Sequence, residues 1–365
     1  MNSSVSVLPD RHAPLPVIAL DGSSPLATRR SSQPLPTPAE LRLRLPLQGP
    51  LAARVREQRD AVRGVLAGED PRLLVVVGPC SLHDSDAALD YARRLATLAP
   101  QVEDQLLLVM RAYVEKPRST VGWKGLVYDP HLDGSGDMAT GLALSRRLLL
   151  EIAELGLPLA SEVLQPLLAG YLDDLLSWVA IGARTSESQV HRELVSGLDL
   201  AVGFKNGTDG SLAVATDAMR SAAHPHQHFG VDAQGRPARV QTLGNPDTHL
   251  VLRGGHPGPN YQREAVDSAC AALRQLGMAP RIMVDCSHAN SGKDPLRQPA
   301  VLAEVIDQRL AGQHALRGVM LESHLFDGAQ ALSCDLRYGV SITDGCLGWA
   351  GTESCLLEAA RRLRG

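Results

Sequence analysis

The chain has 365 residues and 44% of them are hydrophobic, so it can bury the core of one barrel-sized domain or of two smaller ones. Its formal net charge of −4 gives no indication of a nucleic-acid or membrane partner. We therefore expect neither a nucleic-acid nor a membrane partner. The six cysteines are scattered without a C-x-x-C pair, which is typical of a reducing compartment, so we expect a cytoplasmic protein.

Residues 1–49 are rich in serine and proline. Their longest apolar run, residues 15–20, contains a proline and is too short for a signal peptide or a membrane span. We therefore expect an extended N-terminal arm that docks on a neighbouring subunit, with a disordered tail as the alternative.

From residue 72 onward, short apolar runs alternate with longer helix-like stretches. Eight runs suit buried strands, at residues 73–77, 106–110, 157–160, 178–181, 201–204, 250–252, 282–284 and 319–321. Amphipathic stretches lie between them, at residues 85–98, 138–155, 167–176, 188–198, 261–276 and 296–310. Eight strand–helix units predict an α/β fold, a (β/α)8 TIM barrel over residues 50–365, with a doubly wound parallel sheet as the alternative.

The helical rhythm breaks at residues 225–247. This segment predicts two short strands around an Asp-Ala-Gln-Gly turn, which makes a β-hairpin insertion between barrel units five and six. The insertion is either a regulatory site or a hairpin without a function of its own.

Charged side chains stand where the predicted strands end. The cations among them are Arg111, Arg184, Lys205 and Arg253. The C-terminal ends of barrel strands meet at one face, which carries the active site in such folds. We therefore expect a pocket for a strongly anionic ligand, such as two phosphates and a carboxylate, although each cation alone is compatible with a structural ion pair.

More cations lie in the loop after the second predicted strand, residues 111–125. There Lys116 and Arg118 are followed by the hydroxyls of Ser119 and Thr120. A strand that ends in such a loop is a common way to bind a phosphorylated small molecule. A solvated basic loop is the alternative.

The remaining groups at strand ends are a thiol, an imidazole and two carboxylates, namely Cys80, His288, Glu322 and the later Asp344. That donor set suits a borderline divalent metal such as Mn, Fe, Co or Zn. Their wide spacing matches no zinc-finger pattern, so the prediction depends on convergence at one rim of the barrel. A packed cysteine and a satisfied buried histidine are the alternatives.

Nine motifs together resemble type I 3-deoxy-D-arabino-heptulosonate 7-phosphate (DAHP) synthase, within it the microbial subclass regulated by aromatic amino acids. They are 78–84 (GPCSLHD), 116–125 (KPRSTVGWKG), 182–192 (GARTSESQVHR), 203–210 (GFKNGTDG), 252–255 (LRGG), 259–261 (PNY), 285–290 (DCSHAN), 322–324 (ESH) and 341–344 (SITD). The resemblance extends from about residue 50 to the C-terminus. It implies a transferase that condenses phosphoenolpyruvate with D-erythrose 4-phosphate and water to give DAHP and phosphate, the first step of the shikimate pathway.

The resemblance also implies a role for each matching residue. The metal ligands would be Cys80, His288, Glu322 and Asp344. Phosphoenolpyruvate would be bound by Arg111, Lys116, Arg184, Lys205 and Arg253, and the sugar phosphate by Arg118 with Ser119 or Thr120. Lys116 would act on the new alkoxide as a proton donor or electrostatically, and the catalytic group would also include Arg111, Cys80 and His288. Ser119 stands where the family more often has threonine.

In regulated members of this family such a hairpin and the N-terminal arm form an allosteric pocket and subunit contacts. The resemblance therefore implies an aromatic amino acid effector and a homodimer or homotetramer. Asp199 stands where phenylalanine-regulated relatives tend to have serine, and His228 stands near where they tend to have an aromatic residue. If Asp199 lies deep in a pocket, a tyrosine O–H or tryptophan N–H can meet it, so we predict inhibition by these before phenylalanine.

Two other functions are compatible with the fold. One is the sister reaction with a five-carbon sugar phosphate, against which the Lys-Pro-Arg-Ser loop and the long arm argue. The other is a non-catalytic relative, which would have lost a metal ligand or a phosphate-binding arginine, whereas every such residue is present here.

Overall fold

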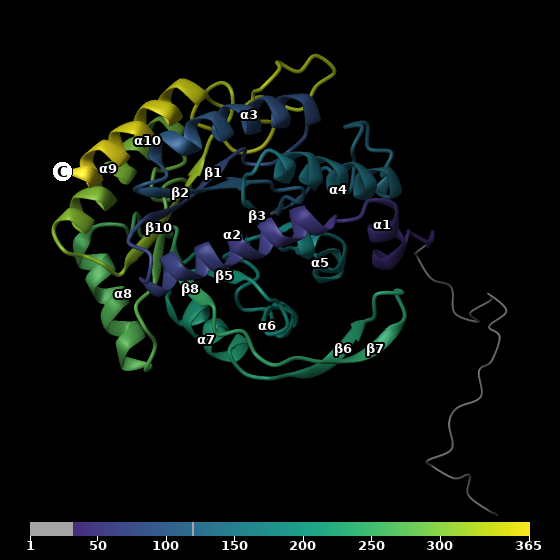
Figure 1. Ribbon diagram of the computed structural model, residues 1–365, viewed down its shortest axis with the longest axis horizontal. Helices are drawn as coiled ribbons and strands as arrows, with labels where there is room; N and C mark the ends of the chain where they lie inside the picture. Colours follow the sequence, from purple (N-terminus) through teal and green to yellow (C-terminus); the bar gives the residue numbers. More distant parts are fainter. Residues whose placement is uncertain (1–31, 119) are drawn as a thin grey trace, which may run out of the picture. The chain divides into compact units, whose positions relative to one another are not determined.

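The computed structural model describes residues 32–118 and 120–365, of which the part from residue 36 onward forms one compact unit. Eight of its strands pair in parallel and close into a barrel (Figure 1). They are β1 (Leu73–Gly78), β2 (Leu106–Arg111), β3 (Leu159–Glu162), β4 (Trp178–Ile181), β5 (Ala201–Lys205), β8 (Thr248–Leu252), β9 (Ile282–Asp285) and β10 (Leu316–Glu322). Barrel strands that follow one another in the chain are neighbours in space. This confirms the (β/α)8 barrel over the doubly wound sheet, whose strand order reverses and whose edges stay open.

A helix follows each barrel strand in the chain. These helices are α3 (Ser85–Val102), α4 (Met138–Glu154), α5 (Pro166–Leu172) with the short 3-10 helix η1 (Asp173–Leu175), α6 (Gln189–Val195), α7 (Ala213–Ala222), α8 (Arg263–Gln275), α9 (Gln298–Leu310), preceded by the 3-10 helix η2 (Pro295–Arg297), and α10 (Trp349–Arg364). In α3 the Asp84 carboxylate accepts from the N–H groups of Asp86 and Ala87, which satisfies donors that a helix start leaves free. None of the helices in the described part of the chain combines the length and apolar character that a membrane span needs.

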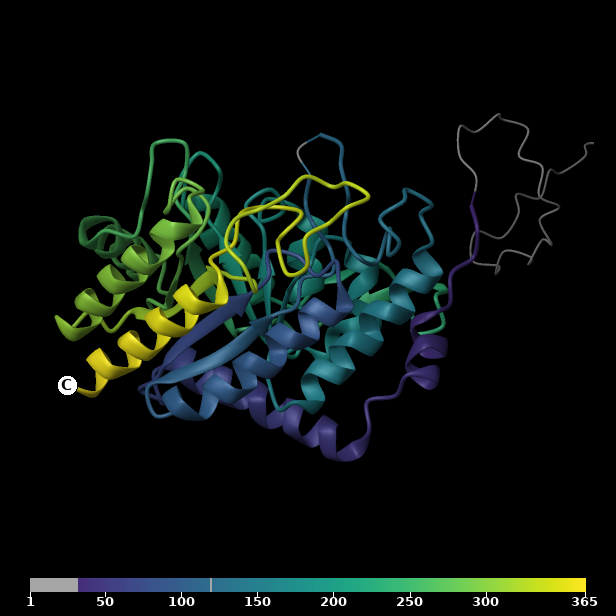
Figure 2. The same ribbon diagram turned by 90° about the horizontal axis from the view of Figure 1, so that it is seen from above.

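The barrel interior is filled by side chains that alternate along the strands. In β1, Leu74 and Val76 belong to the interior cluster, whereas Leu73, Val75 and Val77 pack against the helices. At the N-terminal end of the barrel, α2 (Gly49–Ala67) adds Val62 and Val65 to that interior cluster. Each such buried side chain stabilises the fold by roughly 1.5–3 kcal/mol. With one end closed by α2, the loops that rise on the opposite side in Figure 2 surround the open end.

The predicted arm, residues 1–49, is described only in part, because residues 1–31 lie outside the described residues. Its described part is not extended throughout, since α1 (Pro38–Arg44) is a helix. The Thr37 side chain accepts from the Glu40 N–H, and the Glu40 carboxylate accepts from the Thr37 N–H. Proline content favoured an extended segment, but Pro38 stands in the first helical turn, where its missing N–H removes no intrahelical hydrogen bond.

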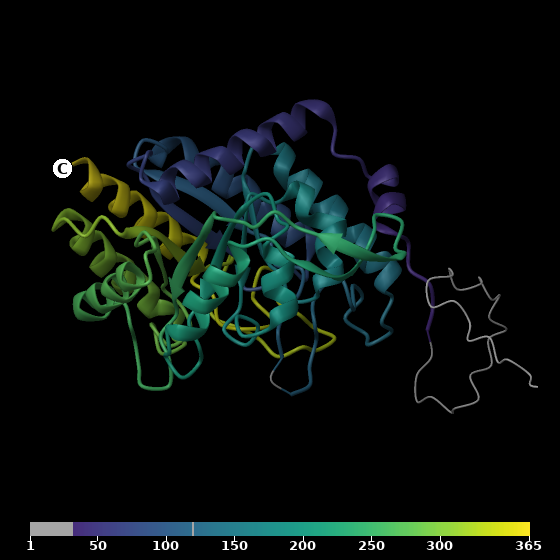
Figure 3. The same ribbon diagram turned by 90° about the horizontal axis from the view of Figure 1, so that it is seen from below.

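The hairpin insertion is confirmed. β6 (Gln227–Val231) and β7 (Pro237–Gln241) form an antiparallel pair between β5 and β8, which are the fifth and sixth barrel strands. The hairpin runs out toward α1 (Figure 3), where the Ala39 N–H donates to the Ala233 carbonyl at 2.9 Å. The arm and the hairpin are therefore in direct contact within the described chain.

Candidate active site

A cavity of about 560 Å³ opens at the C-terminal ends of the barrel strands, among the loops that rise in Figure 2. All six predicted cations line it, namely Arg111, Lys116, Arg118, Arg184, Lys205 and Arg253. They meet there because parallel strands direct their C-terminal ends to one face of the barrel. Thr120 also lines the cavity, whereas Ser119 lies outside the described residues.

Arg111 is the last residue of β2 and is only 1% exposed. Its Nη2 lies 3.1 Å from Glu322 Oε1, and its Cζ lies 3.9 Å from the centre of the Tyr113 ring. The end of β1 comes close beside it, because Gly78 has a φ of 152° and a Cβ there would lie 2.9 Å from the Arg111 carbonyl oxygen. The guanidinium is thus held in one orientation, which suits recognition of a carboxylate or phosphate.

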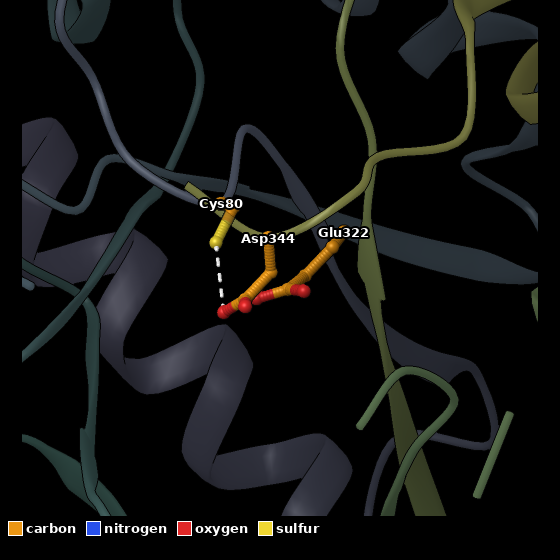
Figure 4. Close-up of side chains that lie close together, drawn as sticks. All are labelled: Cys80, Glu322 and Asp344. Atoms are coloured by element: carbon orange, nitrogen blue, oxygen red, sulfur yellow. Dashed lines mark hydrogen bonds between the residues drawn. The ribbon is translucent and has the colours of Figure 1, made fainter. Parts of the chain in front are cut away.

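Three of the four predicted metal ligands lie together around the Lys116 ammonium group. Lys116 Nζ is 2.6 Å from Cys80 Sγ, 3.0 Å from Asp344 Oδ2 and 3.9 Å from Glu322 Oε1. Figure 4 shows the thiol and the two carboxylates close together, and their ligand atoms lie within 4.8 Å of one another. One sulfur and two carboxylate oxygens on separate chain segments fit a borderline divalent metal.

The electrostatics of this group favour positive charge at its centre. Burial, and then the charge of Glu322, raise the pKa of the Cys80 thiol to about 12. Burial alone would lower the pKa of Lys116, but Cys80 and Glu322 raise it well above its ordinary value. Burial would likewise raise the pKa of Asp344, but Lys116 lowers it to about 2. Asp344 therefore stays ionised beside a cation.

His288, the fourth predicted ligand, lines the same cavity but is outside this group of three. Its Nδ1 lies 2.9 Å from Asp285 Oδ2 and 2.8 Å from Ser287 Oγ. A carboxylate that orients one ring nitrogen in this way is the usual support for a metal-binding histidine. Nε2 would then be the nitrogen that binds a metal.

Asp285 supports a second functional group at the end of β9. Lys205 Nζ lies 2.9 Å from Asp285 Oδ2, while Asp285 Oδ1 accepts from the N–H and O–H of Ser287. Burial would raise the pKa of Asp285, but His288 and Lys205 lower it well below its ordinary value. One permanent carboxylate therefore positions both the Lys205 ammonium and the His288 ring.

Arg184 and Arg253 belong to the more open part of the cavity. Arg184 is exposed, and Arg253 is half-buried with its backbone N–H donated to Asn206 Oδ1 at 2.8 Å. Burial lowers the pKa of Arg253, and the charge of Arg184 lowers it further, although Asp285 opposes both. Two guanidinium groups that repel each other in this way are stabilised by an anionic ligand.

Several lining residues were not predicted from the sequence, among them Tyr113, Lys293 and Gln298. Lys293 adds a further cation, and its place in the loop after β9 is the signal that could have identified it. Gln298 is fully buried, and its amide donates to the Glu322 carbonyl and accepts from the Glu322 N–H, both at 2.8 Å. No sequence pattern indicates this contact, because it joins the start of α9 to the end of β10.

Asp199 lies at the surface of the described chain. Its side chain is 84% exposed, and its Oδ1 lies 2.5 Å from Arg63 Nη2. The carboxylate is thus an exposed ion pair and does not lie deep in a pocket of the described chain. Inhibition by tyrosine or tryptophan before phenylalanine stays a prediction. His228 is half-buried on β6, with its Nδ1 3.0 Å from the Phe229 carbonyl oxygen.

Known proteins share both the sequence and the fold. A family profile described as the DAHP synthetase I family matches residues 51–357. The Tyr-sensitive phospho-2-dehydro-3-deoxyheptonate aldolase of Escherichia coli is 51% identical over 91% of this chain and 94% of its own length, and the Phe-sensitive protein of that organism is 48% identical over 90% and 94%. A solved structure of the aldolase from Francisella tularensis is 41% identical with a TM-score of 0.89, covering 93% of this chain and all of that one. The chain therefore belongs to the DAHP synthetase I family.

Proposed function

We propose that this chain is a 3-deoxy-7-phosphoheptulonate synthase, a transferase that condenses phosphoenolpyruvate with D-erythrose 4-phosphate and water to give DAHP and phosphate. The observation that carries the proposal is the meeting of six predicted cations with Glu322 and Asp344 in one cavity, whose two carboxylates form a group with the buried Cys80 thiol. Two phosphorylated substrates can lie side by side only where positive charge is this dense. The names of the relatives, phospho-2-dehydro-3-deoxyheptonate aldolase, support the same reaction.

The two substrates would use different parts of the cavity. The carboxylate and phosphate of phosphoenolpyruvate would be bound by the residues at strand ends and by the loop lysine, namely Arg111, Lys116, Arg184, Lys205 and Arg253. The phosphate of erythrose 4-phosphate would be bound by Arg118 with Thr120 or Ser119 at the loop. Its aldehyde would then point inward, toward the group formed by Cys80, Glu322 and Asp344.

The new bond forms when C3 of phosphoenolpyruvate attacks the aldehyde carbon, whose carbonyl electrons become an alkoxide. Lys116 is placed to give this alkoxide a proton, or to stabilise it by charge alone. Attack leaves cationic character at C2, where water adds and releases a proton that restores Lys116. The resulting hemiketal phosphate then expels phosphate as C2 becomes a carbonyl.

A divalent metal is part of this proposal, with Cys80, Glu322, Asp344 and His288 as its ligands. When bound, it would serve as a Lewis acid for the aldehyde oxygen. Mn, Fe, Co and Zn stay the predicted ions, because the donor set contains sulfur, oxygen and imidazole nitrogen.

Phosphate release tests the proposed reaction directly. We expect release only when both substrates are present, loss of release with a chelator, and recovery when a divalent metal is added back. The same assay with arabinose 5-phosphate tests the sister reaction. The proposal would be contradicted if phosphoenolpyruvate released phosphate with arabinose 5-phosphate but not with erythrose 4-phosphate, or with neither sugar.

Arg184→Ala and Arg253→Ala should each weaken phosphoenolpyruvate binding. Each variant loses a charge-assisted contact of roughly 1.5–3 kcal/mol, or about ten- to a hundredfold in kcat/KM. Arg361→Ala is the matched control, since this arginine pairs with Glu358 on α10 and does not line the cavity. Equal losses at all three sites would mean that overall charge, without a specific pocket, explains the basic rim.

We also expect feedback inhibition by an aromatic amino acid. The relatives named above are Tyr-sensitive and Phe-sensitive, and the contact between α1 and the hairpin offers a place for an effector. Titration of tyrosine, tryptophan and phenylalanine against phosphate release should show inhibition by at least one of them. No response to any of the three would make the hairpin purely structural. The homodimer or homotetramer and the cytoplasmic location stay predictions.

A further inference from the structure

Glu115 is a buried acidic residue that the proposed chemistry does not use. It directly precedes Lys116 in the loop after β2, and it is 2% exposed. Its carboxylate accepts hydrogen bonds from the Tyr128 O–H at 2.9 Å, the Leu164 N–H at 3.2 Å and the Gln165 N–H at 3.3 Å. Tyr128 belongs to the returning part of the same loop, whereas Leu164 and Gln165 lie in the turn between β3 and α5. One carboxylate therefore joins three chain segments.

Glu115 and Lys116 face opposite sides of the loop. Lys116 lines the cavity and Glu115 does not, as expected of neighbours on an extended backbone. The loop base is closed by two backbone hydrogen bonds, from the Lys116 N–H to the Lys124 carbonyl at 2.8 Å and from the Val127 N–H to the Val114 carbonyl at 3.3 Å. Glu115 holds this closed base from the side away from the cavity.

The tip of the loop has no comparable support among its described residues. Arg118, Thr120 and Val121 are exposed, and Val121 is 90% exposed. Where the tip stands over the cavity therefore depends on how firmly the base is held. Arg118 and Thr120 lie at this tip and line the cavity.

We propose that Glu115 is a positioning residue for erythrose 4-phosphate, the second substrate. Glu115 ties the loop base to the β3–α5 turn and so sets where Arg118 meets the sugar phosphate. This inference depends on the proposed function, because it assigns the loop tip to erythrose 4-phosphate. Phosphoenolpyruvate should depend on Glu115 much less, since only Lys116 of its five proposed ligands belongs to this loop. The expected signature is a much larger change in KM for erythrose 4-phosphate than for phosphoenolpyruvate.

How firmly Glu115 holds the loop base should also depend on pH. Burial raises the pKa of Glu115 to about 7, although the hydrogen bonds from Tyr128, Gln165 and Leu164 oppose the shift. A carboxyl whose pKa is raised by folding contributes most stability when protonated and loses that contribution as pH rises through the raised value. The ionised carboxylate therefore favours opening of the loop base toward water, so the loop should be held less firmly at pH 8 than at pH 6.

The other charged and titratable groups near Glu115 are present in both wild type and Glu115→Gln. The charge of Glu162 acts on Glu115 and also raises its pKa. On the other elements packed against it, Lys124 lies 5.9 Å from the Tyr128 ring centre, and His191 Nε2 lies 2.8 Å from the Leu164 carbonyl oxygen. The sugar phosphate itself titrates near pH 6. A difference in pH dependence between wild type and Glu115→Gln therefore reports on residue 115 alone.

Kinetics of Glu115→Gln and Glu115→Ala test the proposal, with Glu154→Gln at the exposed end of α4 as the matched control. Glutamine keeps the volume and can still accept from the two backbone N–H groups, so KM for erythrose 4-phosphate should stay near wild type at pH 6. Alanine should raise that KM by about ten- to a hundredfold, with KM for phosphoenolpyruvate changed by less than about threefold. From pH 6 to 8, the KM for erythrose 4-phosphate should rise roughly three- to tenfold more in wild type than in Glu115→Gln. Equal rises in both KM values, or identical pH profiles, would overturn the proposal.

Trp123 provides a readout that needs no activity. It lies in the same loop, is 7% exposed, and donates its indole N–H to the Asp129 carbonyl at 2.9 Å. Its fluorescence should change between pH 6 and 8 in wild type, but not in Glu115→Gln or in Trp123→Phe. The pKa of His249, which contacts Trp178, is lowered by burial to about 4 and lies outside this window.

The two readouts separate failure of the inference from failure of the proposed function. If wild type releases no phosphate from either sugar, the proposed function fails, while the Trp123 titration still decides whether Glu115 holds the loop. If wild type is active and Glu115→Gln behaves like it in both readouts, only the inference fails. If Glu115→Ala does not fold, the glutamine comparison stands by itself.

Discussion

Replacing Cys80 with alanine is expected to abolish metal-supported turnover while the barrel stays folded. Its thiol is the softest donor of the predicted ligand set, and its Sγ lies with carboxylate oxygens of Glu322 and Asp344 within 4.8 Å. Loss of a donor should weaken metal binding and lower kcat/KM by more than about a hundredfold. The measurements are metal content, phosphate release after chelation and metal addition, and the melting temperature.

Cys270→Ala is the matched control for this substitution. Cys270 is also buried, but it lies on α8, outside the group formed by Cys80, Glu322 and Asp344. Both variants remove one buried sulfur, so the melting temperatures of the metal-free proteins should fall by similar amounts. Only Cys80→Ala should lose metal binding. If Cys80→Ala keeps near wild-type activity after metal addition, Cys80 is only a packing residue and its assignment as a metal ligand is wrong.

Replacing Lys116 with methionine is expected to lower kcat by about 10²- to 10⁴-fold while metal binding persists. The ammonium group lies against Cys80 Sγ and Asp344 Oδ2, where the alkoxide forms in the proposed reaction. Removing it deletes both the proton donor and the nearby charge, but none of the metal ligands. Pre-steady-state phosphate release shows whether the chemical step is slowed, and metal content shows whether the metal is still bound.

Lys124→Met is the control for charge in the same loop, since Lys124 is exposed and does not line the cavity. It should change kcat by less than about twofold. Lys116→Arg then separates the two roles, because arginine keeps the charge but gives up a proton far less readily. If Lys116→Met loses its metal together with its activity, the lysine supports the ligand group and the proposed proton transfer is wrong.

The barrel and most of its rim could be predicted from the sequence for a geometric reason. Parallel strands direct all their C-terminal ends to one face, so a charged residue at a strand end is placed without knowledge of any loop. Arg111 ends β2, Lys205 ends β5 and Glu322 ends β10, and all three line the cavity. Alternation of apolar runs with amphipathic stretches was sufficient to identify these ends, because a closed barrel buries its strands on both faces.

Contacts between distant segments were decided only by the tertiary structure. Asp199 meets Arg63 136 residues away in the chain, Glu115 meets Leu164 49 residues away, and the Gln298 amide meets the Glu322 backbone 24 residues away. Such pairs depend on the paths of whole loops over the barrel ends, and no local pattern of residues encodes those paths. Burial follows from the same paths, and burial decides whether a carboxylate stays an exposed ion pair, as in Asp199, or becomes a desolvated group with a raised pKa, as in Glu115.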